Sequence, residues 1–401
     1  MAADSSVSWT TVPGFLQDSD AQTARCFRRV RWDRLCSIAS NANRGLKCVP
    51  LDRVASGLNN VVRELEFSDQ TRWAARVPIE RGGPPQARRI KLGDEVATMQ
   101  FITERSSLPV PRVLTYDTDE DNAAAAPFML IEVLPGIVAM DALGGYAEHR
   151  GVIPTRDRQT FYQSVAKCHV QMTALRLPKI GAIIRSPDAG YESGPLPGIG
   201  GPFDTAAAFF EAWADTVEFK WDKETITRMM QRGPISAERM VAIIDGFPRR
   251  IKAMAGRLSR HNEGPFPLCH GDFLHINIMV DEASFNVTGV IDWEDACTVP
   301  WELVAFPEFL QAMPPSFDLP QHYGWDGQPL GREARERWRE RREYVEMVKS
   351  AERDSGGDDD LLSAHLGSDR SQALAYSYGA FTSTGKLGFY ERVMEEMEKG
   401  V

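Results

Sequence analysis

Three polar side chains stand at fixed separations in the segment CHGDFLHINIMVDEASFNVTGVIDWEDA, residues 269–296. Asp272 follows His-Gly, Asn277 lies five residues later, and Asp292 comes fifteen residues after that. Such a set suits phosphoryl transfer, in which one carboxylate meets a substrate hydroxyl while an amide and a second carboxylate hold magnesium on nucleotide phosphates. Taken singly, each residue is explained as well by a turn or a loop, but together they favour this chemistry.

A metal-hydrolase interpretation of the same segment fits less well. His270, Asp272 and His275 do not form an H-x-x-x-H or H-E-x-x-H pattern, which is the spacing that places two zinc ligands on one helical face. We expect His270 to brace the loop. Asn277 lies in an apolar run, where a buried amide needs a partner.

The elements that must position these residues can be predicted from hydrophobic periodicity. Residues 287–291 are apolar and predict a strand that delivers Asp292 to a cleft. Further upstream, alternation over 61–67 and 72–78 around a short polar turn predicts a hairpin. Residues 92–104 show helical spacing, and residues 128–134 predict a buried strand that ends before Pro-Gly. The first third of the chain is therefore predicted to form an antiparallel sheet with one helix, and the rest of the chain shows mostly helical patterns.

The segments His270-Gly271-Asp272 with Asn277 and Ile291-Asp292-Trp293-Glu294 resemble the signature of the aminoglycoside phosphotransferase family, and the order of elements extends the resemblance over roughly residues 50 to 310. The resemblance implies an α+β, protein-kinase-like two-lobed fold, with a small antiparallel-sheet N-lobe carrying one main helix and a larger, mostly helical C-lobe. It implies ATP or GTP as donor, Mg²⁺ as metal, and the hydroxyl of a small molecule as acceptor.

Three regions follow from this comparison. Residues 1–45 are expected to form an N-terminal extension with a helix around Cys26–Asn41. Residues 46–134 would be the nucleotide-binding N-lobe, and residues 135–401 the catalytic and substrate-binding C-lobe.

The resemblance also implies roles for individual residues. Asp272 would be the catalytic aspartate, with Asn277 and Asp292 as the magnesium ligands. Arg76 on the second hairpin strand, paired with Glu95 on the helix, stands where the kinase-like fold has a lysine, and its planar guanidinium departs from that pattern. The remaining nucleotide contacts would come from a covering loop and an interlobe hinge, formed by Gly57, Asn59 and Asn60 in the loop and Glu132 and Leu134 in the hinge.

The amino-acid composition disfavours some classes of binding partner. The formal net charge of −10 and the lack of a dominant basic stripe disfavour a nucleic-acid partner and are compatible with a cationic acceptor. No apolar stretch reaches the roughly 18 residues of a membrane span, and the N-terminus lacks a secretory pattern. The six cysteines show no C-x-x-C pair, as expected for free thiols in a reducing, cytoplasmic setting.

Two other functions remain open. A catalytically silent binding or scaffold protein with the same fold is compatible with the arginine at position 76. A protein kinase is less compatible, because the chain has no D-F-G or A-P-E segment. The identity of the acceptor, the choice between ATP and GTP, and the oligomeric state do not follow from the sequence.

Overall fold

The computed structural model describes residues 9–188, 190–356 and 359–399, which fall into two compact units. The first unit takes in residues up to 164 together with 184–191 and 270–296, and the second takes in the rest. The helices and strands of the first unit are α1 (Val12–Asp18), α2 (Ala21–Arg29), α3 (Trp32–Ala42), β1 (Cys48–Ser56), β2 (Asn60–Phe67), β3 (Arg72–Pro78), α4 (Pro85–Arg105), β4 (Val113–Asp117), β5 (Phe128–Glu132), β6 (Ile137–Val138), α5 (Tyr146–His149), β11 (Ile278–Val280) and β12 (Val287–Val290).

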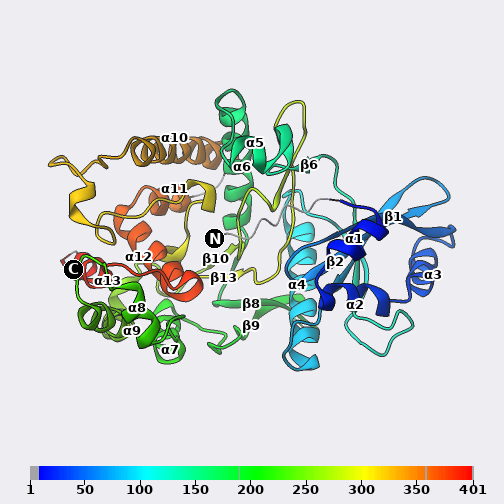
Figure 1. The fold of residues 1–401 in the computed structure, drawn as a ribbon, viewed down its shortest axis with the longest axis horizontal. Coiled ribbons are helices and arrows are strands. Elements are labelled where there is room, and N and C mark those ends of the chain that lie inside the picture. The colour runs from blue at the N-terminus through cyan, green and yellow to red at the C-terminus, as the bar shows by residue number, and fades with distance from the viewer. Residues whose placement is uncertain (1–8, 189, 357–358, 400–401) are drawn as a thin grey trace. The chain divides into compact units, whose positions relative to one another are not determined.

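The first unit is built on a five-stranded antiparallel sheet in the order β1-β2-β3-β5-β4. The predicted hairpin is confirmed: Val61 faces Val77 and Leu65 faces Trp73 across β2 and β3. Apolar side chains of these strands are buried against helices α1, α2 and α3, which Figure 1 shows in blue beside β1 and β2. Burial of one sheet face fixes the strand register, because a slip of one residue would turn every apolar side chain outward.

The single helix expected around Cys26–Asn41 is wrong. The chain forms two helices, α2 and α3, with a break at Val30 and Arg31. Val30 takes an extended conformation, and the backbone N–H of Arg31 donates to the carbonyl of Ala124 at 2.9 Å. This tertiary hydrogen bond replaces one that a continuous helix would have made.

One other element differs in length from the prediction. The helix predicted over 92–104 begins earlier, at Pro85, whose fixed φ suits a first helical position. After this helix the chain pairs as a strand only from Val113, because Pro109 and Pro111 have no N–H for the ladder.

A second, three-stranded sheet of the first unit has the order β12-β11-β6. Ile278 pairs with Val290, and Met279 pairs with Val138. Gly136 precedes β6 with φ +97, and a Cβ there would overlap the carbonyl of Val280. This sheet therefore fixes the chain on both sides of the turn that leads from β11 to β12.

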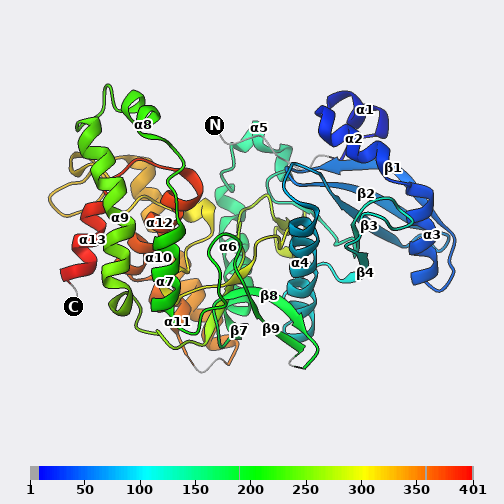
Figure 2. The same cartoon turned by 90° about the horizontal axis from the view of Figure 1, so that it is seen from below.

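The second unit is mostly helical. Helix α9 contacts both α7 and α13, as Figure 2 shows, around an aromatic core that includes Trp213, Phe247, Phe381 and Tyr390. Its helices and strands are β7 (Arg176–Leu177), α7 (Ala206–Thr216), α8 (Lys223–Met229), α9 (Ala237–Leu258), β10 (Phe266–Cys269), β13 (Cys297–Thr298), α10 (Arg332–Asp354), α11 (Leu361–Leu366), α12 (Asp369–Gly379) and α13 (Tyr390–Lys399). Along the chain, α6 (Thr155–Ala174), β8 (Gly181–Ser186) and β9 (Gly190–Gly194) carry residues of both units.

An antiparallel sheet with one long helix in one unit and a mostly helical second unit confirm the expected α+β class. Over the part of the chain that the structure describes, no helix combines the length and the apolar character needed to span a bilayer.

Candidate functional site

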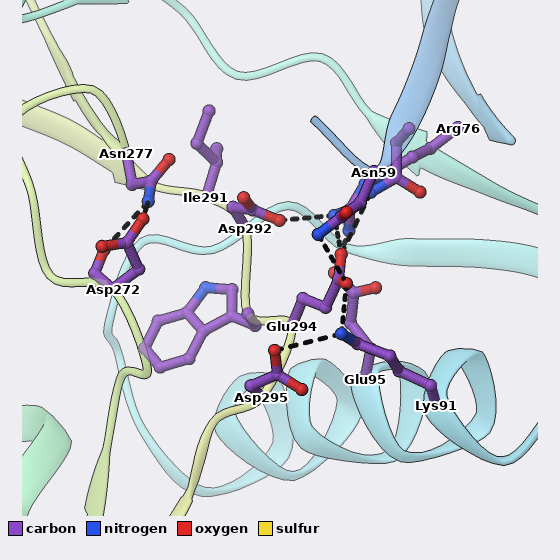
Figure 3. A network of polar contacts seen from close by, with 12 residues as sticks. Asn59, Arg76, Lys91, Glu95, Asp272, Asn277, Ile291, Asp292, Glu294 and Asp295 are labelled. Carbon is purple, nitrogen blue, oxygen red and sulfur yellow. Dashed lines mark hydrogen bonds and ion pairs between the residues drawn. The ribbon is translucent and has the colours of Figure 1, made fainter. Parts of the chain in front are cut away.

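The loop before β11 holds Asp272 and Asn277 together. The side-chain amide of Asn277 donates to the Asp272 carbonyl at 2.9 Å and to its carboxylate at 3.2 Å. Asn277 is 5% exposed, so these bonds satisfy an amide that would otherwise be buried without a partner. The structure thus places two of the predicted site residues in direct contact (Figure 3).

His270 braces this loop, as the sequence suggested. Its Nδ1 accepts from the backbone N–H of Asp272 at 3.0 Å, which leaves Nε2 to donate to the Ile291 carbonyl at 2.9 Å. Burial lowers the pKa of His270 despite that hydrogen bond and the nearby charge of Asp292, so the imidazole is neutral. A neutral histidine therefore ties the loop of Asp272 to the segment of Asp292.

The pKa of Asp272 is raised above its ordinary value. Partial burial in the loop is the main cause, the negative charge of Asp292 adds to it, and the hydrogen bond from Asn277 opposes both. A carboxyl with a raised pKa is a better proton acceptor than an ordinary aspartate. The mutual repulsion of the two carboxylates also means that a cation beside them would be stabilised.

Asp292 follows β12 in a left-handed conformation, with φ +64. Aspartate tolerates this region better than most residues. The next side chain, Trp293, is fully buried, donates from Nε1 to the Val290 carbonyl at 3.0 Å, and lies 4.6 Å from the His270 ring. The buried indole anchors the turn, and the Asp292 side chain remains 44% exposed.

Arg76 on β3 links the sheet, the helix and the Asp292 segment. Its Nη1 donates to Glu95 on α4, while its Nη2 donates to Asp292 and lies 3.3 Å from a Glu294 oxygen. The Arg76 and Glu95 side chains are 10% and 4% exposed. The predicted Arg76–Glu95 pair is therefore present. The two terminal nitrogens of the guanidinium point to different carboxylates, whereas a lysine would offer them a single compact ammonium group.

Lys91, which the sequence analysis did not single out, belongs to the same cluster. Lys91 on α4 lies 2.6 Å from Glu294 and 3.0 Å from Asp295. Burial acts to lower the pKa of Lys91, but the two carboxylates outweigh it and raise that pKa, so the lysine is charged. Lys91 stands four residues before Glu95, one helical turn away, and this spacing was the available signal.

The loop before β2 also reaches Glu294. The side-chain amides of Asn59 and Asn60 donate to its two carboxylate oxygens at 3.0 and 3.1 Å (Figure 3). Gly57 shapes this loop through a backbone N–H that donates to the Asn60 carbonyl at 3.0 Å. The two asparagines thus join the cluster, whereas Gly57 supports them.

The predicted hinge residues stand apart from these polar contacts. Glu132 ends β5, and its backbone N–H donates to the Arg112 carbonyl at 3.0 Å, so that N–H is already used. Leu134 lies two residues further on and covers Gly289 of β12.

The chemistry of the donors fits magnesium. The amide nitrogen of Asn277 faces Asp272, which leaves its oxygen for a metal, and Asp292 gives Arg76 only one of its two oxygens. Within the described residues, no group of three or more His, Cys, Asp or Glu side chains is placed to hold a metal ion. Magnesium does not need such a group of three side chains, because it takes one or two carboxylates and completes its coordination shell with phosphates and water.

A family model described as the Phosphotransferase enzyme family matches residues 51–301 of this chain. Curated relatives match over shorter stretches. A subtelomeric hrmA-associated cluster protein of Aspergillus fumigatus is 33% identical over 89 residues, 22% of this chain and 17% of that protein. The mitochondrial protein "altered inheritance of mitochondria protein 9" of Meyerozyma guilliermondii is 24% identical over 156 residues, 39% of this chain and 24% of that protein. The chain thus spans about a quarter or less of these relatives' own length.

Solved structures are similar at low identity. A proposed aminoglycoside phosphotransferase of Ralstonia eutropha is 14% identical, with a TM-score of 0.49 over 92% of this chain and 99% of that chain. An aminoglycoside phosphotransferase of Streptomyces rimosus is also 14% identical, with a TM-score of 0.40 over 84% of this chain and 98% of that chain. These values are too low to assign a function, so the family match carries the assignment.

The matched range 51–301 makes up more than half of the chain, and it includes the hairpin, the helix of Glu95, the loop of Asp272 and the turn of Asp292. The chain therefore belongs to the Phosphotransferase enzyme family.

Proposed function

We propose that this protein is a magnesium-dependent O-phosphotransferase that moves the γ-phosphate of ATP or GTP to a hydroxyl of a small molecule. The observation that carries the proposal is the continuous polar chain in the first unit. Arg76 joins Glu95 to Asp292, His270 joins the Asp292 segment to the loop of Asp272, and Asn277 is bonded to Asp272.

In this mechanism Asp272 is the catalytic residue. Its carboxylate accepts a hydrogen bond from the acceptor hydroxyl, orients it and takes up its proton, which the raised pKa favours. Asn277 and Asp292 would hold magnesium, which when bound neutralises charge on the phosphates. Arg76, held by Glu95, would contact the phosphates.

The nucleotide would lie on the sheet of the first unit, in the proposed N-lobe of residues 46–134. Gly57, Asn59 and Asn60 would cover the phosphates, and the main chain near Glu132 and Leu134 would bond the base. Because the Glu132 N–H already donates to Arg112, other main-chain groups of this segment must serve the base. Residues 135–401 would bind the acceptor. A cationic acceptor and a cytoplasmic location stay predictions.

The test is nucleoside-diphosphate release from Mg-ATP and Mg-GTP across a library of hydroxyl-bearing small molecules. Acceptor-dependent release by the wild type, lost in Asp272→Asn, would support the proposal and name the substrate class. Asparagine is close in size to aspartate, and its side-chain oxygen can still accept a hydrogen bond from the Asn277 amide, so the control should fold.

Two results would count against the proposal. Transfer of phosphate to added proteins instead of small molecules would point to a protein kinase. Tight Mg-nucleotide binding with no product from any acceptor would favour the catalytically silent alternative, which the arginine at position 76 leaves open.

A further inference from the structure

Four hydrogen-bond donors from separate parts of the first unit converge on one carboxylate. Asn59 and Lys91 lie 3.0 and 2.6 Å from Oε1 of Glu294. Asn60 and Arg76 lie 3.1 and 3.3 Å from its Oε2. These donors come from the loop before β2, the start of β2, strand β3 and helix α4. The Glu294 side chain is 12% exposed, so the donors nearly enclose it.

Such a set of donors suits a phosphate as well as a carboxylate. Both ligands present several anionic oxygens, and charge-assisted hydrogen bonds from arginine and lysine are the strong contacts that hold either one. The two asparagine amides add neutral donors on the loop that is proposed to cover the nucleotide. Glu294 therefore occupies a site whose chemistry matches a nucleotide phosphate.

We propose that Asn59, Asn60, Arg76 and Lys91 form a phosphate subsite that Glu294 fills in the nucleotide-free protein, and that an incoming nucleotide phosphate displaces the Glu294 carboxylate. The inference rests on the proposed function and adds two residues to it. Lys91 becomes a phosphate-binding residue, and Glu294 becomes an internal competitor.

The surrounding charges explain why an exchange is needed. Arg76 and Lys91 bring two positive charges, whereas their contacts Glu95, Asp292, Glu294 and Asp295 bring four negative ones. A phosphate added to this cluster would be repelled unless a carboxylate moved away or magnesium entered.

The donors around Glu294 can adjust to a new ligand. The Lys91 side chain is 44% exposed and has a second anchor in Asp295, so it can turn from Glu294 to a phosphate without losing every partner. Leu58, next to Asn59 in the loop, is 71% exposed, as expected for a loop tip that can shift.

The experiment is calorimetric titration of the full chain with inorganic tripolyphosphate and, separately, with a non-hydrolysable ATP analogue and magnesium. The variants are Lys91→Met, Glu294→Gln and Asp295→Asn. Asp295→Asn is the matched control for Glu294→Gln, because each removes one negative charge and so one ion pair with Lys91, but only Glu294 fills the subsite. Lys252→Met, which breaks a surface pair with Asp215, is the control for the loss of a lysine charge.

We expect Lys91→Met to weaken tripolyphosphate binding about tenfold, the loss of one hydrogen bond to a charged group, while Lys252→Met leaves it unchanged. Glu294→Gln should tighten tripolyphosphate binding by about tenfold, and clearly more than Asp295→Asn does. The gain should shrink when Lys91→Met is added to Glu294→Gln, because the freed donor is then missing. Lys91→Arg should restore most of the affinity lost in Lys91→Met.

Unchanged binding in Lys91→Met would overturn the role of Lys91. Equal effects of Glu294→Gln and Asp295→Asn, or weaker binding in Glu294→Gln, would overturn the role of Glu294 as a competitor. In both cases normal binding of the ATP analogue by the wild type leaves the proposed phosphotransferase function standing. Failure of the wild type to bind the analogue would instead reject that function.

Discussion

Replacing Arg76 with methionine should destabilise the first unit strongly, because Arg76 and Glu95 form a nearly buried ion pair. Methionine keeps much of the side-chain volume but removes every donor. Glu95, 4% exposed, would then hold a negative charge without its partner. Removal of one member of a buried pair costs about 3–5 kcal/mol.

The same reasoning predicts the effect of a second substitution, Glu95→Gln. Adding Glu95→Gln to Arg76→Met removes the orphaned charge, so at least about 2 kcal/mol of the loss should return, since neutral replacements of buried pairs are often tolerated. Glu95→Gln alone should cost less than Arg76→Met, because Arg76 keeps Asp292 and Glu294 as partners.

The assay is urea-induced unfolding at pH 7.5, followed by tryptophan fluorescence and by far-ultraviolet circular dichroism, for the wild type, both single variants and the double variant. The double-mutant cycle gives the coupling free energy between the two side chains. A loss below about 1 kcal/mol in Arg76→Met, or a double variant as unstable as the sum of the single variants, would refute the argument that a buried charge pair organises the site.

Three further predictions test other parts of the structure. Burial raises the pKa of Asp94 to about 6, so the free energy of unfolding of the wild type should fall as pH rises from about 4 through 6. Asp94→Asn should stabilise the protein by about 1 kcal/mol at pH 8 and by nothing near pH 4, and the expected gain is small because Asp94 is only half-buried. Denaturant unfolding of both proteins at both pH values tests this prediction. Gly136→Ala should lower the free energy of unfolding by at least about 2 kcal/mol, because φ is +97 and a Cβ would overlap the Val280 carbonyl. Gly93→Ala, in α4 with open space around it, should instead raise that free energy by up to about 1 kcal/mol. Equal melting temperatures of the two variants would contradict this. Phe247→Ala should lower the free energy of unfolding by about 3–5 kcal/mol, since its ring is 1% exposed in the aromatic core of the second unit, and an unchanged denaturation midpoint would contradict that packing.

The sequence was most informative where the pattern is local. The spacing of Asp272, Asn277 and Asp292 predicted a common site, and the structure brings Asn277 onto Asp272 within a single loop. The hairpin and the long helix could be predicted because alternation and helical periodicity are properties of short windows. The pairing of Arg76 with Glu95 was expected from the family resemblance, and the structure contains that ion pair.

The sequence was least informative where distant segments meet. Lys91 was missed, because nothing near it in the chain shows that Glu294, about 200 residues later, supplies its counter-charge. The break between α2 and α3 was missed for a similar reason. Neither Val30 nor Arg31 is a helix breaker, and the bond that favours the break comes from Ala124, which lies far along the chain.

The discontinuity of the first unit has a consequence for biosynthesis. Residues up to 164 leave the ribosome first, but the segment 270–296, with Asp272 and Asp292, is complete only about 130 residues later. At about 5–20 residues per second, that delay is on the order of 10 s. During this interval the nascent sheet holds Arg76 with Glu95 but without Asp292. The polar cluster of the first unit is therefore completed late in translation, and a nascent chain stalled between the two segments would expose an incomplete charge cluster to chaperones.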